Sequence, residues 1–168
     1  VVGAAVVGAV VGDADVVWAM QAPQLIHTLP EDIQVAVGTT NGEVVLGMNN
    51  TSKPLSDRRV RQAILMAIDR NGLLDVVWNG QGTLIGSMVP PTDPWFTDLS
   101  HTWPYDPARA RKLLAEAGYP NGLTLRLRAA ALPYATAASR VVASDLAQIG
   151  ITVESDELEF PARWLDVV

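Results

Sequence analysis

Residues 56–91 read SDRRVRQAILMAIDRNGLLDVVWNGQGTLIGSMVPP, and the rest of the chain is arranged about them. The apolar residues of this stretch recur at the spacing that lines one face of an α-helix, and they are Val60, Ala63, Ile64, Ala67 and Ile68. Ser56 or Asp57 supplies an N-cap oxygen for this helix. The Asn-Gly pairs at 71–72 and 79–80 tolerate left-handed backbone angles and so predict a break and an end. We therefore predict a helix, a break at 71–72, a second helix over 73–78 and an extended loop over 81–91.

The C-terminal half predicts a helix followed by a β-α-β unit. Asp106 and Pro107 form a capped helix start, and Gly118 ends that helix. Apolar and polar residues alternate over 123–128, which is typical of a strand with one face exposed to solvent. A helix is expected over 134–149 and a second strand over 151–154. This order predicts paired parallel strands joined by a right-handed crossover.

The N-terminal part and the connecting segments carry weaker patterns. We predict a buried helix over 4–11, a short strand over 16–20 and one or two helical turns within 21–29. Asn41-Gly42 is a strong hairpin signal, so 33–39 and 43–49 are expected to pair as antiparallel strands. The aromatic segment 92–105 has no period and is expected to be a loop, and 160–168 should begin a last helix.

Composition limits the class of protein. A chain of 168 residues supports one domain, and a net charge of −6 with a pI near 4.7 argues against a nucleic-acid partner. The absence of cysteine excludes disulfides and thiolate chemistry. The apolar opening lacks the basic start of a signal peptide and is too short to span a bilayer. We expect a helix that is trimmed at its start.

The residues that could carry chemistry are sparse. His27 and His101 have no partner at metal-ligand spacing, and no serine sits in a glycine-flanked elbow. The acidic cluster at 154, 156, 157 and 159 lacks the glycine turn of a calcium loop and is interpreted as a solvated strand end. The glycines at 80, 82 and 86 do not form a phosphate cradle, and Trp18 and Trp78 are assigned to packing. No cofactor and no metal site are predicted.

Four segments, in this order and spacing, resemble a known family: NTSKPLSDRRVRQAILMAIDRNGLL (50–74), GTLIGSMVPP (82–91), YDPARARKLLAEAGYPNGLTLRL (105–127) and ASDLAQIGITVE (143–154). The chain is similar to the extracytoplasmic solute-binding proteins of ABC importers, in the peptide/nickel class called solute-binding family 5. The resemblance covers essentially the whole chain.

This resemblance implies a type II periplasmic-binding-protein-like clamshell that closes over a solute. Residues 1–168 would form a single domain, most of the second lobe, with the first lobe missing and both ends truncated. Its fold class would be α/β (mixed α+β), a mixed sheet flanked by helices. The implied function is capture of a peptide, metal chelate or similar solute outside the membrane for delivery to the transmembrane subunits of an ABC permease. The implied location is extracytoplasmic, either periplasmic or lipid-anchored at the outer face of the membrane.

The resemblance also places eight residues in the ligand cleft: Met48, Asn49, Ser87, Met88, Ala130, Ala131, Leu132 and Tyr134. Relatives often present polar groups after the 123–128 strand, whereas this chain has apolar 129–132, which favours a smaller or more apolar ligand. An alternative function is a ligand-sensing domain of the same fold within a transcription regulator. A third is an enzyme built on this fold, which would require clustered titratable residues that the sequence does not show.

Overall fold

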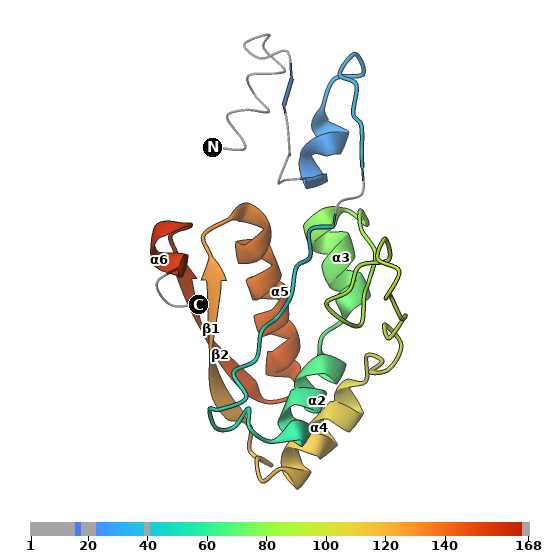
Figure 1. Cartoon of the computed structure of the whole chain (residues 1–168). Coiled ribbons are helices and arrows are strands. Elements are labelled where there is room, and N and C mark those ends of the chain that lie inside the picture. The colour runs from blue at the N-terminus through green and yellow to red at the C-terminus, as the bar shows by residue number, and fades with distance from the viewer. Residues whose placement is uncertain (1–15, 18–22, 39–40, 166–168) are drawn as a thin grey trace.

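The computed structural model describes residues 16–17, 23–38 and 41–165. Two strands, β1 (Leu123–Ala130) and β2 (Ile151–Leu158), form a small parallel sheet. The helices are η1 (Pro23–Thr28, a 3₁₀ helix), α2 (Arg58–Ala67), α3 (Arg70–Trp78), α4 (Pro107–Glu116), α5 (Pro133–Gln148) and α6 (Ala162–Leu165). Helix α5 packs against both strands, α2 pairs with α4, and η1 lies above α3 (Figure 1). The result is a mixed α/β arrangement with one helical layer on one face of the sheet.

Helix α2 is the centre of the hydrophobic core, as its periodicity predicts. Val60, Ala63 and Met66 have no exposed surface. Asp57 caps the helix, and its Oδ1 accepts a hydrogen bond of 2.8 Å from the backbone N–H of Arg59. The buried cluster combines side chains of α2, α4, α5 and the start of β2: Val60, Ala63, Ile64, Met66, Ala67, Ile68, Ala110, Leu114, Val142, Leu146, Ile149 and Ile151.

The break between α2 and α3 lies earlier than predicted. Ile68 is extended (φ −89°, ψ 119°), and Asp69 caps α3 by accepting a 3.1 Å hydrogen bond from the backbone N–H of Gly72. Asn71 and Gly72 therefore belong to the first turn of α3, where a side-chain cap from Asp69 stabilises the turn. The predicted break at 71–72 is wrong for this reason. The end of α3 is confirmed, because Asn79 adopts the left-handed conformation with φ 53°.

The β-α-β unit is confirmed, and its strands run further than predicted. The register pairs Leu123 with Ile151 and Ala130 with Leu158. The acidic cluster lies mostly within β2, where Glu154 and Asp156 occupy the outer face of the sheet, which is open to water. On that face Arg126 Nε lies 3.7 Å from Asp156 Oδ2. In the part of the chain that the structure describes, the sheet has two parallel strands, so the mixed sheet is not present there.

The N-terminal part of the structure confirms only one of the predicted elements. The helix over 4–11 lies outside the described residues, and of the predicted strand over 16–20 only Val16 and Val17 are described, without strand structure. The helical turns within 21–29 are confirmed by η1. The predicted hairpin is wrong, since 33–38 and 42–49 form no strand ladder. Val35, Val37, Val44 and Val45 are exposed, so the two segments share no buried apolar face, and a lone two-stranded hairpin is marginal in water.

Two arginine side chains donate to the carbonyl oxygens at the C-terminal ends of neighbouring helices. Arg59 of α2 donates from its guanidinium to the carbonyl oxygen of Glu116, the last residue of α4. Arg111 of α4 donates from Nε to the carbonyl oxygen of Gln148, the last residue of α5, at 2.9 Å. These carbonyls have no partner within their own helices, so each arginine satisfies a helix end and ties two helices together.

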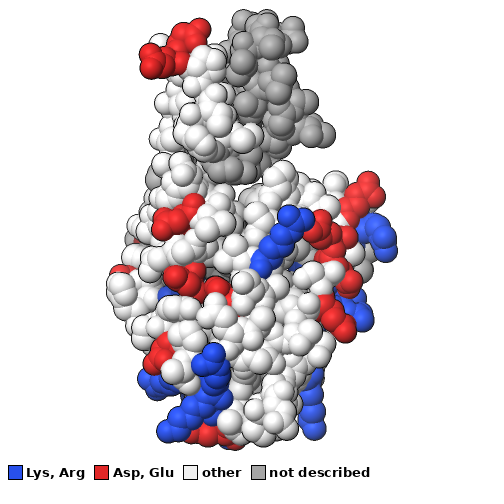
Figure 2. Space-filling model, turned by 180° about the vertical axis from the view of Figure 1, so that it is seen from behind, with Lys and Arg blue, Asp and Glu red and all other residues white. Residues whose placement is uncertain are grey.

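The surface is charged with both signs. Figure 2 shows acidic and basic side chains interspersed over the rear of the lower body, while few charged side chains lie on the described upper part.

Among the described helices, none has the length and apolar character needed to cross a membrane.

Candidate functional site

The carboxyl ends of β1 and β2 lie at the same edge of the sheet because the strands are parallel. The ladder ends where Ala130 pairs with Leu158, and the backbone N–H of Ala131 donates to the Leu158 carbonyl oxygen at 2.7 Å. Helix α5 begins at Pro133, directly after this end. In Figure 1 the same edge holds the end of β1 and the start of α5. We call residues 129–134 the carboxyl edge; in open α/β sheets ligands bind outside such ends.

The start of α5 leaves backbone donors available at the carboxyl edge. Leu132 is the N-cap residue, and no side chain of the described residues caps the helix. The Leu132 carbonyl accepts from the Thr136 N–H at 2.9 Å, and the Leu132 N–H donates to the Ala130 carbonyl at 2.7 Å. N–H groups in an uncapped first helical turn can donate to ligand oxygens.

Helix α3 adds an aromatic ring to this edge. The rings of Trp78 and Tyr134 lie 6.0 Å apart between centroids with an interplanar angle of 40°. Both side chains are half-buried. Trp78 is the last residue of α3 and Tyr134 belongs to the first turn of α5, so the contact joins a helix end to a helix start. This geometry is a tilted aromatic pair, which supports both packing and ligand contact.

The loop that carries Ser87 and Met88 is held near the other end of α3. Arg70, the first residue of α3, donates from Nη1 to the Ile85 carbonyl oxygen at 3.2 Å and from Nη2 to the Ser100 carbonyl oxygen. Nine helical residues separate the ends of α3 by about 12 Å. The Ser87 hydroxyl accepts from the Val89 N–H at 3.3 Å. The loop is thus fixed away from the end of α3 that carries Trp78.

Glycine is required within this loop at position 86. A Cβ atom on Gly86 would lie 2.1 Å from the backbone carbon of Leu99. The loop backbone therefore passes directly against the segment 98–100, and Met88 remains 74% exposed beyond it.

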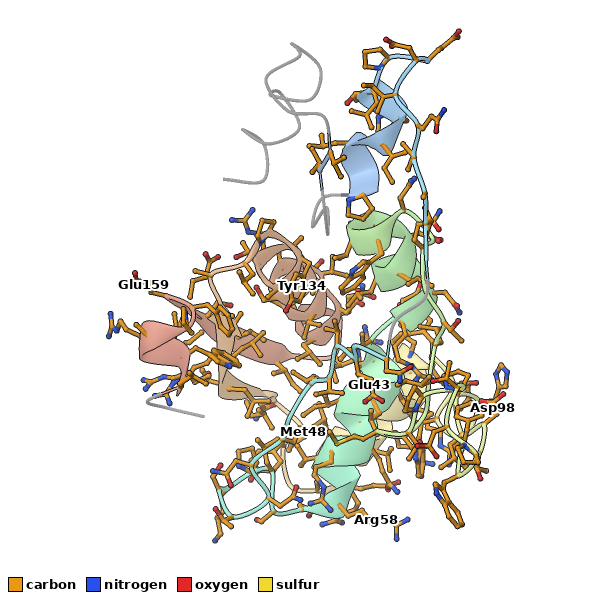
Figure 3. All side chains as sticks on the ribbon, turned by 45° about the horizontal axis from the view of Figure 1, so that its top comes forward. Glu43, Met48, Arg58, Asp98, Tyr134 and Glu159 are labelled. Atoms are coloured by element: carbon orange, nitrogen blue, oxygen red, sulfur yellow. The ribbon has the colours of Figure 1, made fainter. Side chains whose placement is uncertain are left out.

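Met48 and Asn49 do not join the carboxyl edge. Met48 is half-buried and packs against the core, where it lines a small apolar groove together with Leu125 and Leu127 of β1. The Asn49 Oδ1 accepts from the N–H and hydroxyl of Thr51 at 3.0 and 2.7 Å, a local turn. Figure 3 shows Met48 beside α2 and Tyr134 at the start of α5. Of the eight predicted residues, the structure therefore gathers four at one edge: Ala130, Ala131, Leu132 and Tyr134.

The sequence assigned Trp78 to packing, which its contact with the Tyr134 ring confirms, but its position beside the carboxyl edge was not predicted. The signal that could have found it is its place immediately before the Asn79-Gly80 helix end, since residues at helix ends face loops and clefts. A second, polar cleft lies between the outer face of the sheet and α6, with Arg128, Asp156 and Arg163 in its lining. With Glu157, which also lines it, the cleft has two basic and two acidic side chains.

Titratable groups do not gather at the carboxyl edge. In the residues that the structure describes, no three His, Asp or Glu side chains are grouped so that they could hold a metal ion. The pKa of Asp145 in α5 is raised by burial of its carboxylate, which accepts a 3.0 Å hydrogen bond from the Asp69 backbone N–H. This carboxylate holds the junction of α2 and α3 and lies within the core, so its role is structural.

The chain belongs to the bacterial extracellular solute-binding proteins, family 5. The model of the middle region of that family matches residues 3–167. This family membership confirms the resemblance seen in the sequence, and it assigns the chain to a class of solute-binding proteins.

Individual relatives agree with this assignment. The glutathione-binding protein GsiB of Pectobacterium atrosepticum is 36% identical over 124 residues, which are 73% of this chain and 24% of the relative. The GsiB protein of Escherichia coli (strain K12) gives the same identity and coverage. The chain thus spans about a quarter of the length of the curated relatives that it matches.

Solved structures share the fold. A dipeptide-binding protein from Pseudoalteromonas sp. SM9913, in complex with Met-Leu, superposes with a TM-score of 0.66 and 32% identity, over 70% of this chain and 24% of that protein. The periplasmic binding protein DppA from Helicobacter pylori, in complex with the peptide STSA, gives a TM-score of 0.65 and 28% identity, over 68% of this chain and 22% of that protein. The mixed α/β fragment therefore matches part of periplasmic binding proteins.

Proposed function

We propose that the chain is part of the solute-binding component of an ABC importer, which captures a peptide or similar small solute outside the membrane. The observation that carries this proposal is the match of the family over residues 3–167. The relatives named for glutathione and dipeptides point to short peptides or peptide-like solutes as the class to test first. The proposed location is extracytoplasmic, periplasmic or lipid-anchored, and the proposed partners are permease transmembrane subunits.

Within that protein, residues 1–168 are proposed to form most of the second of two lobes. The chain spans 24% of the relatives' length, so a solute site shared with another lobe would be only half present here. Ligand affinity in a clamshell arises from burying the solute between two surfaces. The carboxyl edge supports this role because it combines backbone donors at the start of α5 with half-buried aromatic rings.

The proposed contacts of the solute are those of the sequence prediction. Ala130, Ala131, Leu132 and Tyr134 would contact it from the carboxyl edge. Ser87 and Met88 would contact it only if the solute extends along α3, because Arg70 fixes their loop at the other end of that helix. Met48 and Asn49 are proposed for the side of the lobe near the connection to the other lobe.

Calorimetry on the whole polypeptide that contains this chain tests the proposal. We expect Met-Leu or reduced glutathione to bind and to raise the midpoint temperature of thermal unfolding. At a ligand concentration 100 times the Kd, the free energy of unfolding should increase by about 2.7 kcal/mol. We expect residues 1–168 alone to show little stabilisation. Failure of every dipeptide and of glutathione to bind the whole protein would contradict peptide capture. Stabilisation of the isolated 1–168 chain by micromolar solute would contradict the need for a second lobe.

A further inference from the structure

The two segments that supply the aromatic pair contain neither lysine nor arginine. Residues 71–108 contain four aspartates but no lysine and no arginine, and residues 129–139 contain no charged residue of either sign. The contact of Trp78 with Tyr134 lies where these two segments meet.

The basic side chains nearest in sequence are engaged elsewhere. Arg70 binds the carbonyl oxygens of Ile85 and Ser100. Arg128 Nε lies 3.9 Å from Asp156 Oδ2 on the outer face of the sheet. Arg140 Nη2 lies 4.0 Å from Glu157 Oε1. None of these cations is held at the aromatic pair.

The charged group closest to the pair in α3 is acidic. Asp75 precedes Trp78 by one helical turn, and a Cβ atom on Gly80 would lie 3.6 Å from its Oδ1. A carboxylate at this end of α3 repels an acidic ligand group and does not disturb an apolar one. Asp75 therefore disfavours an acidic solute side chain that lies beside Trp78.

The polar atoms of the two rings are open to a ligand. Neither the Trp78 indole N–H nor the Tyr134 hydroxyl has a hydrogen-bond partner among the described residues, and none of the buried side-chain nitrogen and oxygen atoms there lacks a partner. Both atoms therefore reach solvent. Each ring offers an apolar face together with a free polar tip, a combination common at ligand contacts.

We propose that Trp78 and Tyr134 form the contact surface for an uncharged, apolar part of the solute, such as an aliphatic or aromatic peptide side chain. The inference rests on the proposed function and adds a specificity-determining role for Trp78. The aromatic pair would then favour solutes with apolar side chains, and Asp75 would disfavour solutes with acidic side chains.

Calorimetry with two dipeptides tests the inference on the whole polypeptide. We expect Met-Leu to bind at least about tenfold more tightly than Glu-Glu, since Glu-Glu would place carboxylates beside apolar rings and Asp75. Trp78→Ala and Tyr134→Ala should each weaken Met-Leu binding by about three- to tenfold, the scale of one aromatic contact. Trp78→Phe and Tyr134→Phe keep a ring and should recover most of that loss.

Trp95→Ala is the matched control, because Trp95 is 82% exposed in the loop that follows position 91 and does not belong to the pair. We expect it to leave the affinity for Met-Leu unchanged. Thermal unfolding of each variant checks its fold, and Trp78→Leu replaces Trp78→Ala if the alanine variant does not fold. Binding of Met-Leu should also change the tryptophan emission of the wild-type protein, and Trp78→Phe should abolish that change.

The outcomes separate the inference from the proposed function. If the wild-type protein binds Met-Leu but Trp78→Ala weakens binding no more than Trp95→Ala does, the inference is wrong and the proposed function stands. Equal affinity for Glu-Glu and Met-Leu would likewise overturn the apolar preference. If no dipeptide and no glutathione binds the wild-type protein, the proposed function fails, and the inference fails with it.

Discussion

The substitution Gly122→Ala probes the place where the two strands begin. Gly122 has a φ of +84°, and its added Cβ atom would lie 1.9 Å from the carbonyl oxygen of Gly150. That oxygen accepts the hydrogen bond of 3.2 Å from the Leu123 N–H at the start of the sheet. The new methyl group would therefore occupy the position of the carbonyl that opens the ladder between β1 and β2.

Two costs add at this position. The left-handed backbone of a non-glycine residue costs about 1–2 kcal/mol. Relief of the collision with the Gly150 carbonyl by a backbone shift costs about 1–3 kcal/mol more, as for other overpacked sites. We therefore expect Gly122→Ala to lower the free energy of unfolding by about 2–5 kcal/mol in total. Gly118→Ala is the matched control, because Gly118 has a φ of +96° but no atom within 4 Å of the added Cβ.

Urea unfolding followed by far-UV circular dichroism measures both variants. Gly118→Ala should show the backbone cost of about 1–2 kcal/mol alone, and Gly122→Ala should exceed it by about 1 kcal/mol or more. If the two variants lose the same stability within about 0.5 kcal/mol, the close approach of Gly122 and Gly150 does not constrain the sheet.

Three further variants test other parts of the fold. Met66→Ala removes a side chain with no exposed surface and should lower the free energy of unfolding by about 2–5 kcal/mol in urea titrations, whereas a loss below about 1 kcal/mol would contradict the core assignment. Arg70→Ala should free the 85–100 loop, so limited proteolysis should cut there faster than in the wild type while α2 stays protected. Burial raises the pKa of Asp145 above 3.8, so the folded state favours the protonated carboxyl, and this group reduces stability as pH rises through that pKa. Asp145→Asn should therefore gain stability relative to the wild type as the pH rises above 3.8, and a pH-independent difference would show that burial does not raise this pKa.

The helices could be predicted from the sequence wherever the cap and the apolar stripe agree. Asp57 before α2 and Asp106 with Pro107 before α4 give both signals, and both helices begin there. The start of α3 could not be predicted, because Asn71-Gly72 reads as a break when the side chain of Asp69 is ignored. A single capping hydrogen bond moved the boundary by three residues.

Strand length and strand pairing depend on what covers each face. Residues 154–157 carry three acidic side chains and are predicted to lie at the end of the strand, yet β2 continues to Leu158 with these side chains exposed. The Asn41-Gly42 pair favours a turn. Pairing of the two flanking segments as strands also requires that they share a buried face, which they do not have here. Local sequence does not contain that information.

The site was predictable in part. The parallel order of β1 and β2 brings Ala130 to Tyr134 together, as expected for residues that follow a strand. The distances of Met48 and Ser87 from this edge depend on long-range packing, namely the core contacts of Met48 and the hold of Arg70 on the loop. Trp78 reaches the edge only because α3 packs against α5, which periodicity cannot reveal.

The two arginine ties have a mechanical consequence. Arg59 links α2 to the end of α4, and Arg111 links α4 to the end of α5. Hydrogen bonds from charged side chains therefore connect α2, α4 and α5 one after another. Relative sliding of any two helices would break a bond to a helix-end carbonyl. A protein that closes over a solute would thus turn this helical block as a single rigid body, and spin labels placed on α2 and α5 would report one unchanged separation in the open and closed forms.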